Sequence, residues 1–547
     1  MKLLTKMMHL QEQHGAVTDS MLREMSKEEG VPLYRLEGLR GFYPVFRATP
    51  GRKMQVQVCR DIVCMMKGGP QFCSKVKSAL SNAADVEVEE VSCVGRCDTA
   101  PAATINEVPV SGSVEAITAY ATGGKPLPSN APTTTPRRWS TDPYANEKEH
   151  YSVIKKFLKP GDDRQRDEVI NILKEADLRG LGGAAFPTGM KWDLTRKAVG
   201  RPKYVVCNAD ESEPGTFKDR VILEELPHLL IEAMVLAGWM IGATEGIIYI
   251  RHEYAKEKKA LQQAIEKARR FGALGKKILG SDTDFDLQIF VSPGGYIMGE
   301  ETALLEALED KRGEPRNKPP FPVDYGLWGK PTLMNNVETF AAIPIILERG
   351  AAWWGAQGKG NYKGLKYMCV SGDVAKPGVY CVPWGTTVHE LLTLCGGVPD
   401  GKALYAFSPG GASTNFLPAS KLDTALDFKA MQEAGSSLGT GAMVFMAAGR
   451  DVLELAISEV KFFRNESCGK CVPCRVGSHK AVDLVETALA GKPQPDLVAL
   501  LQDLNSTLAQ TSICGLGQVA MVPLMSVINY FPDDALPRLQ GSAGRRK

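Results

Sequence analysis

The chain has 547 residues, which is too many for one hydrophobic core, so roughly three to four domains are expected. With 44% hydrophobic and 23% charged residues, its composition excludes the disordered and fibrous classes of protein. The formal net charge of +2 gives no electrostatic reason to propose nucleic acid or an anionic membrane surface as a partner.

No stretch of the sequence predicts a membrane span or a secretory signal. The most apolar run, residues 233–243, is too short to cross a bilayer and predicts a buried helix leading into the strand GIIYI. A signal peptide needs an uninterrupted apolar core near the N-terminus, and here Lys6 and His9 interrupt any such core. We therefore expect a cytoplasmic protein, in which thirteen cysteines are better explained as metal ligands than as disulfides.

The N-terminal part contains two pairs of cysteines. Residues 1–50 predict short helices, with Asp19 or Ser20 as one N-cap. Two alternating stretches follow, MQVQVC and VEVEEVSC, and these predict strands that end beside the pairs Cys59/Cys64 and Cys93/Cys97. Two facing pairs suit a [2Fe–2S] cluster, with one pair for each iron, although zinc ribbons also use two pairs.

The rest of the chain divides by composition into a linker and three further segments. Residues 123–145 are rich in Pro, Thr and Ser without periodicity and predict a linker after a first domain at 1–122. A mixed α/β domain is expected at 146–360, a small β-rich domain at 361–440, and a helical domain at 441–547.

A glycine-rich loop opens the α/β domain in DLRGLGGAAFPTGMKW, residues 177–192. Gly180, Gly182 and Ala185 match the pattern G-x-G-x-x-A of dinucleotide-binding turns. The residues before them have helical rather than strand periodicity, so the strand–turn–helix unit of that fingerprint is missing. On this loop alone, a glycine-rich turn without a ligand is an equally good interpretation.

Two acidic stretches add to the glycine loop. CNADESEPGTFKDR, residues 207–220, follows a predicted strand, and Glu300 and Glu301 begin a predicted helix in YIMGEETALLEALE. Carboxylates favour helix N-termini in any protein, so the second stretch also has a purely structural interpretation. Carboxylates and Asn208 near glycine loops suit ribose and ribityl hydroxyls, while backbone N–H groups and Lys191 suit a phosphate, as flavin mononucleotide (FMN) requires.

The last domain contains the stretch ESCGKCVPCRVG, residues 466–477. Cys468, Cys471 and Cys474 with the remote Cys514 match a [4Fe–4S] site, in which each iron takes one protein sulfur. Zinc is the alternative, but structural zinc prefers two separated pairs. Gly469 and Gly477 are expected to allow tight turning around the cluster.

Taken together, these motifs closely resemble the NADH- and flavin-binding subunit of respiratory complex I and its soluble relatives. RGLGGAAFPTGMKW, CNADESEPGTFKDR, YIMGEETALLEALE, KPPFPVDYGLWGKPTLMNNVET and SCGKCVPCRVG…SICGLG occur in the family's order over about residues 146–535. The first ~120 residues, including LEGLRGFYPVFR, resemble the family's thioredoxin-like [2Fe–2S] subunit. The resemblance implies an α/β multidomain fold: a thioredoxin-like [2Fe–2S] domain, a Rossmann-like FMN and NADH domain, a β-grasp (SLBB-type) domain and a helical [4Fe–4S] domain.

The resemblance also implies site residues by position. The FMN contacts would be Gly180, Gly182, Gly183, Lys191, Asn208, Asp210, Glu211, Tyr296, Gly299, Glu300, Asn335, Asn336 and Thr339. NADH would lie against Phe186, Glu213, Glu301, Lys318 and Phe321. The cluster ligands would be Cys468, Cys471, Cys474 and Cys514 for [4Fe–4S], and Cys59, Cys64, Cys93 and Cys97 for [2Fe–2S].

Three positions depart from the family pattern, namely Leu181, Ala185 and Leu194. Leu194 stands where relatives carry a second aromatic, so part of the nicotinamide stacking would be lost. None of the three removes a cofactor ligand. Glu301, as acceptor for a ribose 2′-hydroxyl, would repel a 2′-phosphate and favour NADH over NADPH.

The implied function is that of an NADH:acceptor oxidoreductase (diaphorase) subunit. FMN accepts a hydride and releases single electrons, so it connects NAD(H) to iron–sulfur clusters, and no side-chain nucleophile or general base is needed. The expected partners are other redox subunits, most simply those of a soluble NAD-dependent formate dehydrogenase. A soluble hydrogenase and complex I are alternatives, as is a non-catalytic electron-transfer or assembly subunit with a decayed flavin site.

Overall fold

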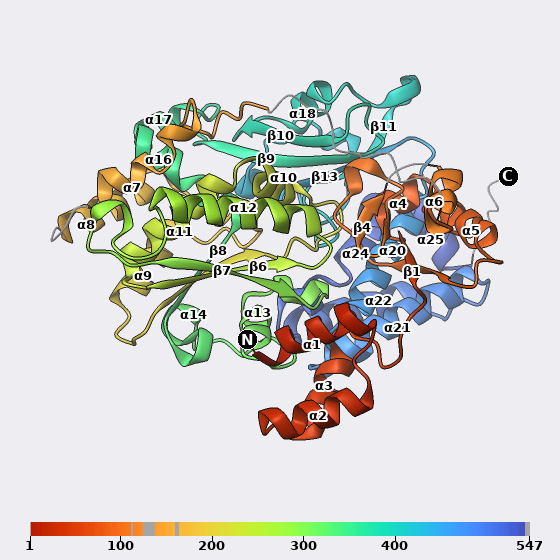
Figure 1. The fold of residues 1–547 in the computed structure, drawn as a ribbon. Helices are drawn as coiled ribbons and strands as arrows, with labels where there is room; N and C mark the ends of the chain where they lie inside the picture. The colour runs from red at the N-terminus through yellow and green to blue at the C-terminus, as the bar shows by residue number, and fades with distance from the viewer. Residues whose placement is uncertain (1, 111–112, 124–136, 159–162, 542–547) are drawn as a thin grey trace.

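The computed structural model describes residues 2–110, 113–123, 137–158 and 163–541, and Figure 1 shows their arrangement. The chain begins with three short helices, as predicted: α1 (Lys2–His14), α2 (Asp19–Glu29) and α3 (Leu33–Phe42). The predicted N-cap of α2 was wrong by one residue. Thr18 has the extended backbone of a cap, and its hydroxyl accepts a hydrogen bond from the N–H of Met21.

A carboxylate far along the chain caps the first helix. The two oxygens of Asp310 accept hydrogen bonds from the backbone N–H of Lys2, at 2.7 Å, and of Leu4, at 3.0 Å. Asp310 follows α13 (Glu301–Leu308), which lies beside the N-terminal helices in Figure 1. The N-terminal segment is therefore fastened to the α/β domain at its first turn.

The first sheet has the strand order β2-β1-β3-β4. Its strands are β1 (Met54–Cys59), β2 (Val86–Val91), β3 (Ala103–Ile105) and β4 (Val108–Val110), and its helices are α4 (Ile62–Met66), α5 (Gly69–Ala79) and α6 (Val114–Ala121). Because β1 and β2 are parallel, their carboxyl ends meet at one edge of the sheet. This brings Cys59, at the end of β1, close to Cys93, which follows β2.

Most of the predicted linker, residues 124–136, lies outside the described residues. Near the end of the predicted linker, the indole N–H of Trp139 donates to Glu225, and the hydroxyl of Tyr144 donates to the buried Glu232. A 3₁₀ turn (Glu147–Glu149) and α7 (Ser152–Phe157) then lead into the α/β domain. The end of the predicted linker is thus packed against that domain.

The α/β domain contains a parallel sheet of order β7-β6-β5-β8. The strands are β5 (Tyr204–Ala209), β6 (Glu245–Arg251), β7 (Asp286–Ser292) and β8 (Thr332–Asn336). The helices are α8 (Asp163–Glu175), α9 (Thr188–Lys197), α10 (Lys218–Glu225), α11 (Pro227–Ile241), α12 (Ala255–Phe271), α13, α14 (Pro322–Tyr325), α15 (Val337–Ala341), α16 (Ile343–Arg349) and α17 (Ala351–Ala356). Helix α8 precedes the glycine loop, as the helical periodicity predicted.

Helix α11 accounts for the most apolar run of the sequence. It is buried on all sides, and Gly238 lets the ring of Phe285 approach so closely that an added Cβ would lie 2.3 Å from it. The helix then leads into β6, as predicted. None of the helices among the described residues combines the length and apolar character needed to cross a membrane.

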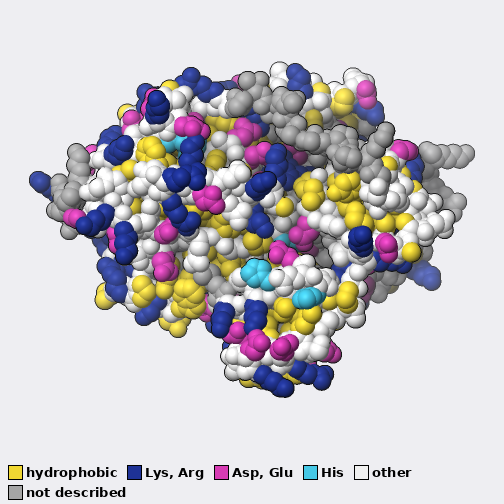
Figure 2. Space-filling view, viewed as in Figure 1, with side chains coloured by type: hydrophobic (Ala, Val, Ile, Leu, Met, Phe, Trp, Pro, Cys, Tyr) yellow, Lys and Arg dark blue, Asp and Glu magenta, His cyan; other side chains and the backbone are white. Residues whose placement is uncertain are grey.

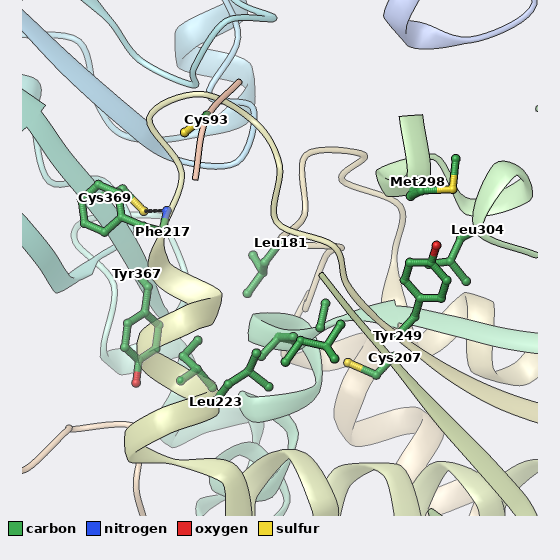
Figure 3. Close-up of a cluster of buried hydrophobic side chains, with 14 of the residues drawn as sticks. Cys93, Leu181, Cys207, Phe217, Leu223, Tyr249, Met298, Leu304, Tyr367 and Cys369 are labelled. Atoms are coloured by element: carbon green, nitrogen blue, oxygen red, sulfur yellow. Dashed lines mark hydrogen bonds between the residues drawn. The ribbon is translucent and has the colours of Figure 1, made fainter. Parts of the chain in front are cut away.

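The next domain is a five-stranded mixed sheet of order β10-β9-β13-β11-β12. Its elements are β9 (Leu365–Gly372), β10 (Gly378–Pro383), α18 (Val388–Leu394), β11 (Leu404–Ser408), β12 (Leu417–Pro418), α19 (Phe428–Glu433) and β13 (Ala442–Ala447). The sheet extends past the expected boundary at residue 440, because β13 pairs with both β9 and β11. In Figure 3, the N–H of Phe217, before α10, donates to the Cys369 sulfur in β9, at 3.0 Å.

The last domain is helical, as predicted. Its helices are α20 (Val452–Asn465), α21 (Val472–Leu489), α22 (Leu497–Thr511), α23 (Gly515–Val519), α24 (Val522–Tyr530) and α25 (Pro532–Leu539). On the face of the molecule in Figure 2, basic and acidic side chains are interspersed, in keeping with the small net charge.

Candidate functional site

The glycine loop is held at the carboxyl end of β8. The N–H of Leu181 donates to the buried hydroxyl of Thr339, at 2.8 Å. An added Cβ on Gly182 would lie 2.9 Å from the Cβ of Asn336, and Gly183 has a φ of +108°. Only glycine fits either position without displacement of the backbone, so the loop is built for close approach.

Two predicted flavin contacts hold this loop through their side chains. The Asn336 oxygen caps α15 by accepting the N–H of Glu338, at 3.0 Å, and its amide donates to Asp219. The hydroxyl of Thr339 already accepts a hydrogen bond from the N–H of Leu181. Both side chains position the loop, whose backbone then faces the site.

Lys191 lies in α9, directly behind the glycine loop. Its ammonium donates to the carbonyl of Met334 at 3.1 Å, and burial lowers its pKa. The neighbouring Trp192 donates its indole N–H to the oxygen of Asn335, at 3.0 Å. A half-buried ammonium with one neutral acceptor is a favourable place for a phosphate.

The acidic motif follows β5 and its members have different environments. The Asn208 amide donates to the carbonyl of Gly299, at 2.9 Å, which joins the motif to the turn before α13. Asp210 is buried, its pKa is raised to about 7 by that burial, and its Oδ2 atom has no hydrogen-bond partner among the described residues. A buried carboxyl oxygen without a donor suits a ligand hydroxyl group.

Glu211 is turned away from this open position. Its carboxylate accepts the backbone N–H groups of Asp219, at 2.8 Å, and Arg220, at 3.0 Å, at the start of α10. The hydroxyl of Tyr254 donates to it at 2.9 Å. The Glu211 side chain therefore caps a helix, and any contact it makes with a cofactor has to come through its backbone.

Glu213 connects three parts of the chain. It accepts the hydroxyl of Tyr296, at 2.6 Å, and the backbone N–H of Ser413, at 2.7 Å. Ser413 belongs to a loop of the β-grasp domain, and Gly439 of the same domain packs against Gly183. The β-grasp loops thus close one side of the site, through residues that the sequence analysis did not name.

The start of α13 carries the second acidic pair. Glu300 is the N-cap and accepts the N–H groups of Thr302, at 2.8 Å, and Ala303, at 2.9 Å, so the structural interpretation of this residue is confirmed. Lys318 forms ion pairs with Glu300, at 2.9 Å, and with Glu301, at 2.8 Å. Glu301 remains partly exposed at the mouth of the site.

Two exposed aromatic side chains lie on segments next to the glycine loop and the Glu301–Lys318 pair. Phe186 is 40% exposed and Phe321 is 51% exposed, on the segments that precede α9 and α14, two helices in contact. Leu194, 46% exposed, projects from α9 nearby. Large exposed rings on facing segments suit a planar ligand.

The four N-terminal cysteines gather where β1 and β2 end. Cys59, Cys64, Cys93 and Cys97 are all buried, and the sulfurs of Cys93 and Cys97 are 3.6 Å apart. Hydrogen bonds with Cys59 and Cys97 lower the pKa of Cys93, whereas hydrogen bonds with Cys64 and then Cys93 raise the pKa of Cys59, and the one with Cys93 raises the pKa of Cys97. A thiolate that close neighbouring thiols stabilise through hydrogen bonds is compatible with ligation of a cluster.

The other four cysteines meet between α21 and α23. Cys471 and Cys514 are the N-caps of these helices, Cys474 lies in the first turn of α21, and Cys468 precedes it. Burial raises the pKa of Cys514 to about 11, while the N–H groups of Gly517 and Leu516 oppose the rise. Helix N-termini favour the negative charge of thiolate ligands.

Glycines allow tight turns and close packing in the segments that carry Cys468–Cys474 and Cys514. Gly469 has a φ of +76°, so it does provide a tight turn. Gly477 does not: it lies inside α21, where an added Cβ would be 2.4 Å from Leu508 of α22. Gly517, which the sequence analysis overlooked, allows Cys474 to approach, since a Cβ there would lie 2.9 Å from that of Cys474.

Ion pairs join the [2Fe–2S] segment to the α/β domain. Arg220 pairs with Asp98 at 2.7 Å, and Arg96 pairs with the fully buried Glu257 at 2.9 Å. His252 lies between Glu107, at 3.1 Å, and Glu253, at 3.5 Å. Burial acts to lower the pKa of His252, but the charges of Glu253 and Glu107 outweigh it and raise the pKa to about 9.

We expect the ion pairs of His252 with Glu107 and Glu253 to make the free energy of unfolding depend on pH. Because the folded pKa lies above the ordinary value of 6.5, the contribution is fully present below pH 6.5 and is lost as pH rises through about 9. A loss of about 3 kcal/mol is expected in the parent chain. Urea unfolding at several pH values, followed separately by probes in each domain, should show the loss for the parent chain and a flatter profile for His252→Gln. An identical pH profile in both would contradict this role.

Four family profiles match the chain in the order of its domains. "Thioredoxin-like [2Fe-2S] ferredoxin" matches residues 1–119, "Nuo51 FMN-binding domain" residues 173–345, "SLBB domain" residues 367–417, and "NADH-ubiquinone oxidoreductase-F iron-sulfur binding region" residues 454–538. These matches confirm the predicted fold class. They also decide between zinc and iron–sulfur at both cysteine groups in favour of iron–sulfur.

Among curated proteins, the chain is 43% identical over 366 residues to an F-type subunit of the NADH-quinone oxidoreductase of Rhizobium meliloti, covering 67% of this chain and 87% of that protein. It is 42% identical to the NADP-reducing hydrogenase subunit HndC of Solidesulfovibrio fructosivorans, covering 67% and 75%. A chain of an air-oxidised NAD⁺-reducing [NiFe]-hydrogenase superposes with a TM-score of 0.86 at 31% identity, covering 98% of this chain and 93% of that one.

The fold and the site together define an NADH-oxidising flavin and iron–sulfur subunit, of the kind found in complex I and NAD⁺-reducing hydrogenases. Its cofactors are FMN, a [4Fe–4S] and a [2Fe–2S] cluster, and its substrate is NADH. In particular, the chain belongs to the family of F-type subunits of NADH-quinone oxidoreductase, with a thioredoxin-like [2Fe–2S] domain fused at its N-terminus.

Proposed function

We propose that this chain is the electron-input subunit of a soluble NAD-dependent formate dehydrogenase in the cytoplasm. Bound FMN would supply hydride acceptance and single-electron release. The [4Fe–4S] cluster would then carry single electrons between FMN and a partner redox subunit, and in the formate-driven reaction they would run from the partner to FMN and NAD⁺. The fused [2Fe–2S] domain supports a soluble diaphorase, and it equally supports a hydrogenase as the parent enzyme, because the hydrogenase chain covers 98% of this one.

The observation that carries the flavin-dependent part of the proposal is the set of groups at the glycine loop that can bind FMN. The ammonium of Lys191 would bind the FMN phosphate, and Oδ2 of Asp210 would accept from a ribityl hydroxyl. The backbones of Gly182 and Gly183, with the amide of Asn335, would line the flavin. Glycine positions that cannot hold a side chain leave space for a flat ring.

The remaining predicted contacts are assigned indirect parts. Asn336 and Thr339 would hold the glycine loop, and Glu300 would fix α13 beneath the site. Tyr296 and Glu213, hydrogen-bonded to each other, would exclude water from the ring edge. Further members of the proposed FMN environment are Gly180, Asn208, Glu211 and Gly299.

NADH would enter between Phe186 and Phe321. Their exposed rings would stack on its planar groups, and Glu301 with Lys318 would meet the ribose hydroxyls and phosphates at the mouth. The carboxylate of Glu301 would disfavour a 2′-phosphate and so favour NADH over NADPH. Leu194, in place of an aromatic, would leave part of the nicotinamide covered by an aliphatic surface.

Electrons would leave beside the [4Fe–4S] cysteines. Exposed apolar side chains flank them: Val472 is 59% exposed, Val476 is 55% exposed and Ile513 is 36% exposed. Apolar side chains gathered at the cluster suit a protein partner that must approach the metal closely. We propose this patch as the docking surface of the partner redox subunit.

An anaerobic NADH titration of the purified chain tests the input step. We expect bleaching of both the flavin absorbance and the broad iron–sulfur absorbance, because hydride and then single electrons enter the protein. If cluster absorbance stays unchanged in a preparation supplied with FMN, the site has decayed, and the alternative of an electron-transfer or assembly subunit holds instead.

The parent enzyme is tested by isolating the native complex through a tag on this chain. The expected result is a co-purifying subunit that contains molybdenum or tungsten, in a complex that reduces NAD⁺ with formate. A nickel-containing subunit, in a complex that reduces NAD⁺ with hydrogen, would contradict the formate dehydrogenase proposal and establish the hydrogenase alternative.

A further inference from the structure

One buried guanidinium joins the flavin motif to the [2Fe–2S] cysteines. Arg251, at the end of β6, is 3% exposed. It donates to the backbone carbonyl of Cys93, at 2.6 Å, and to the backbone carbonyl of Glu211. A single side chain from the α/β domain thus reaches a predicted cluster ligand in one direction and the acidic motif in the other.

The remaining contacts of Arg251 define its electrostatic surroundings. Glu253 binds the guanidinium through both carboxylate oxygens, at 2.6 and 3.0 Å, and the ring of Tyr254 lies 5.1 Å from its central carbon. Glu253 has its other ion pair with His252. The nitrogen Nη2 of Arg251 donates both to Glu253 and to the carbonyl of Cys93, so the positive charge of Arg251 and the negative charge of Glu253 both lie beside Cys93.

The other charged groups near Cys93 are mainly acidic. The buried Asp61 accepts the N–H of Cys93, at 2.8 Å, and the buried Glu213 and Glu459 also face this cysteine. The neighbouring cations have other partners: Arg96 pairs with Glu257 and Arg220 with Asp98. Among the described residues, Arg251 is the cation whose side chain donates to one of the four N-terminal cysteines.

We propose that Arg251 is a positioning residue that raises the reduction potential of the [2Fe–2S] cluster and thereby sets how readily this cluster takes an electron from NADH. The proposal rests on the assignment of Cys93 as a ligand under the proposed function. Reduction adds one electron, delivered from NADH through the flavin, and hence one negative charge to the cluster. A fixed positive charge in a buried setting stabilises that added charge, and its influence is little screened by solvent.

Glu253 then acts in the opposite direction. Its carboxylate offsets part of the Arg251 charge, so the two residues shift the potential with opposite signs. A residue pair that merely fastens the two domains together would not produce this pattern, because removing either partner would loosen the same contact. Opposite shifts are thus the signature of an electrostatic role.

The test is an anaerobic redox titration of the full chain, followed by the electron paramagnetic resonance signals of both clusters. For Arg251→Gln we expect the equilibrium of the [2Fe–2S] cluster to move about tenfold toward the oxidised form, equivalent to a fall of about 59 mV for one electron. Glu253→Gln should move it toward the reduced form. Arg251→Lys, which keeps the charge, should lie close to the parent chain, and the [4Fe–4S] potential should not move in any variant.

The proposal is overturned if Arg251→Gln has a full [2Fe–2S] signal at an unchanged potential, or if Arg251→Gln and Glu253→Gln shift it in the same direction. If Arg251→Gln fails to assemble the cluster, Arg251→Lys and Glu253→Gln decide: an unshifted Glu253→Gln refutes the electrostatic role. A parent chain without any [2Fe–2S] signal refutes the ligand assignment itself, which is a separate failure visible before any variant is made.

Discussion

Replacing Cys514 with serine is expected to remove the [4Fe–4S] cluster and to stop electron delivery to any partner subunit. Cys514 is the proposed ligand from outside the C-x2-C-x2-C loop, and a hydroxyl binds iron far less well than a thiolate. The purified variant should lose about four irons per chain while it retains FMN and the [2Fe–2S] signal. Iron analysis and electron paramagnetic resonance of the NADH-reduced protein measure both effects.

Cys381→Ser is the matched control. Cys381 lies in β10, and its sulfur contacts the hydroxyl of Ser140 at 3.7 Å, away from both cysteine groups. The control should keep its full iron content. Unchanged iron and unchanged cluster reduction in Cys514→Ser would show that another residue is the fourth ligand.

The second large effect is expected for Lys218→Met. Lys218 is fully buried at the start of α10 and pairs with Asp219, at 2.7 Å, and Glu338, at 3.0 Å, while Glu338 also binds the buried Lys366 of the β-grasp domain. Removing one member of such a buried cluster leaves a carboxylate unpaired and costs about 3–5 kcal/mol. A fall in the free energy of unfolding of this size should appear in urea titrations of the α/β domain.

The same substitution should also weaken FMN binding. Asp219 accepts the amide of Asn336, which packs against Gly182 of the glycine loop, so a change at Lys218 is transmitted to the loop. Lys197→Met is the control: Lys197 is 68% exposed and pairs with Asp193 at 2.9 Å, and such surface pairs contribute about 0–1 kcal/mol. Equal losses in the two variants would contradict the assigned role of the buried cluster.

Local patterns in the sequence predicted much of the fold. The alternation in residues 54–59 and 86–93 gave the two parallel strands that deliver Cys59 and Cys93, and the apolar run at 233–243 gave α11. The helical periodicity before the glycine loop correctly argued against a strand–turn–helix dinucleotide site, because α8 is there. Glu300 was also correctly considered as a cap. All of these depend on contacts within a few residues.

What the sequence did not reveal depends on contacts between distant segments. The carboxylate of Glu211 looks like a ligand group beside a glycine loop, yet it caps α10. Ser413 and Gly439 reach the site from the β-grasp domain, and Gly477 serves helix packing rather than a turn. The glycines at 410–411, 439 and 441 could have indicated these loops in the sequence, because loops that approach each other closely need residues without side chains.

The cap that Asp310 provides for α1 has a consequence for how the chain is made. Lys2 and Asp310 are 308 positions apart, so at synthesis rates of about 5–20 residues per second the first helix waits on the order of 15–60 s for its cap. During that interval the N–H groups of Lys2 and Leu4 lack the carboxylate that caps them in the complete fold. If the chain were cut in the linker, capping of α1 by Asp310 would become a bimolecular step whose rate depends on concentration. In the fused chain it is an intramolecular step.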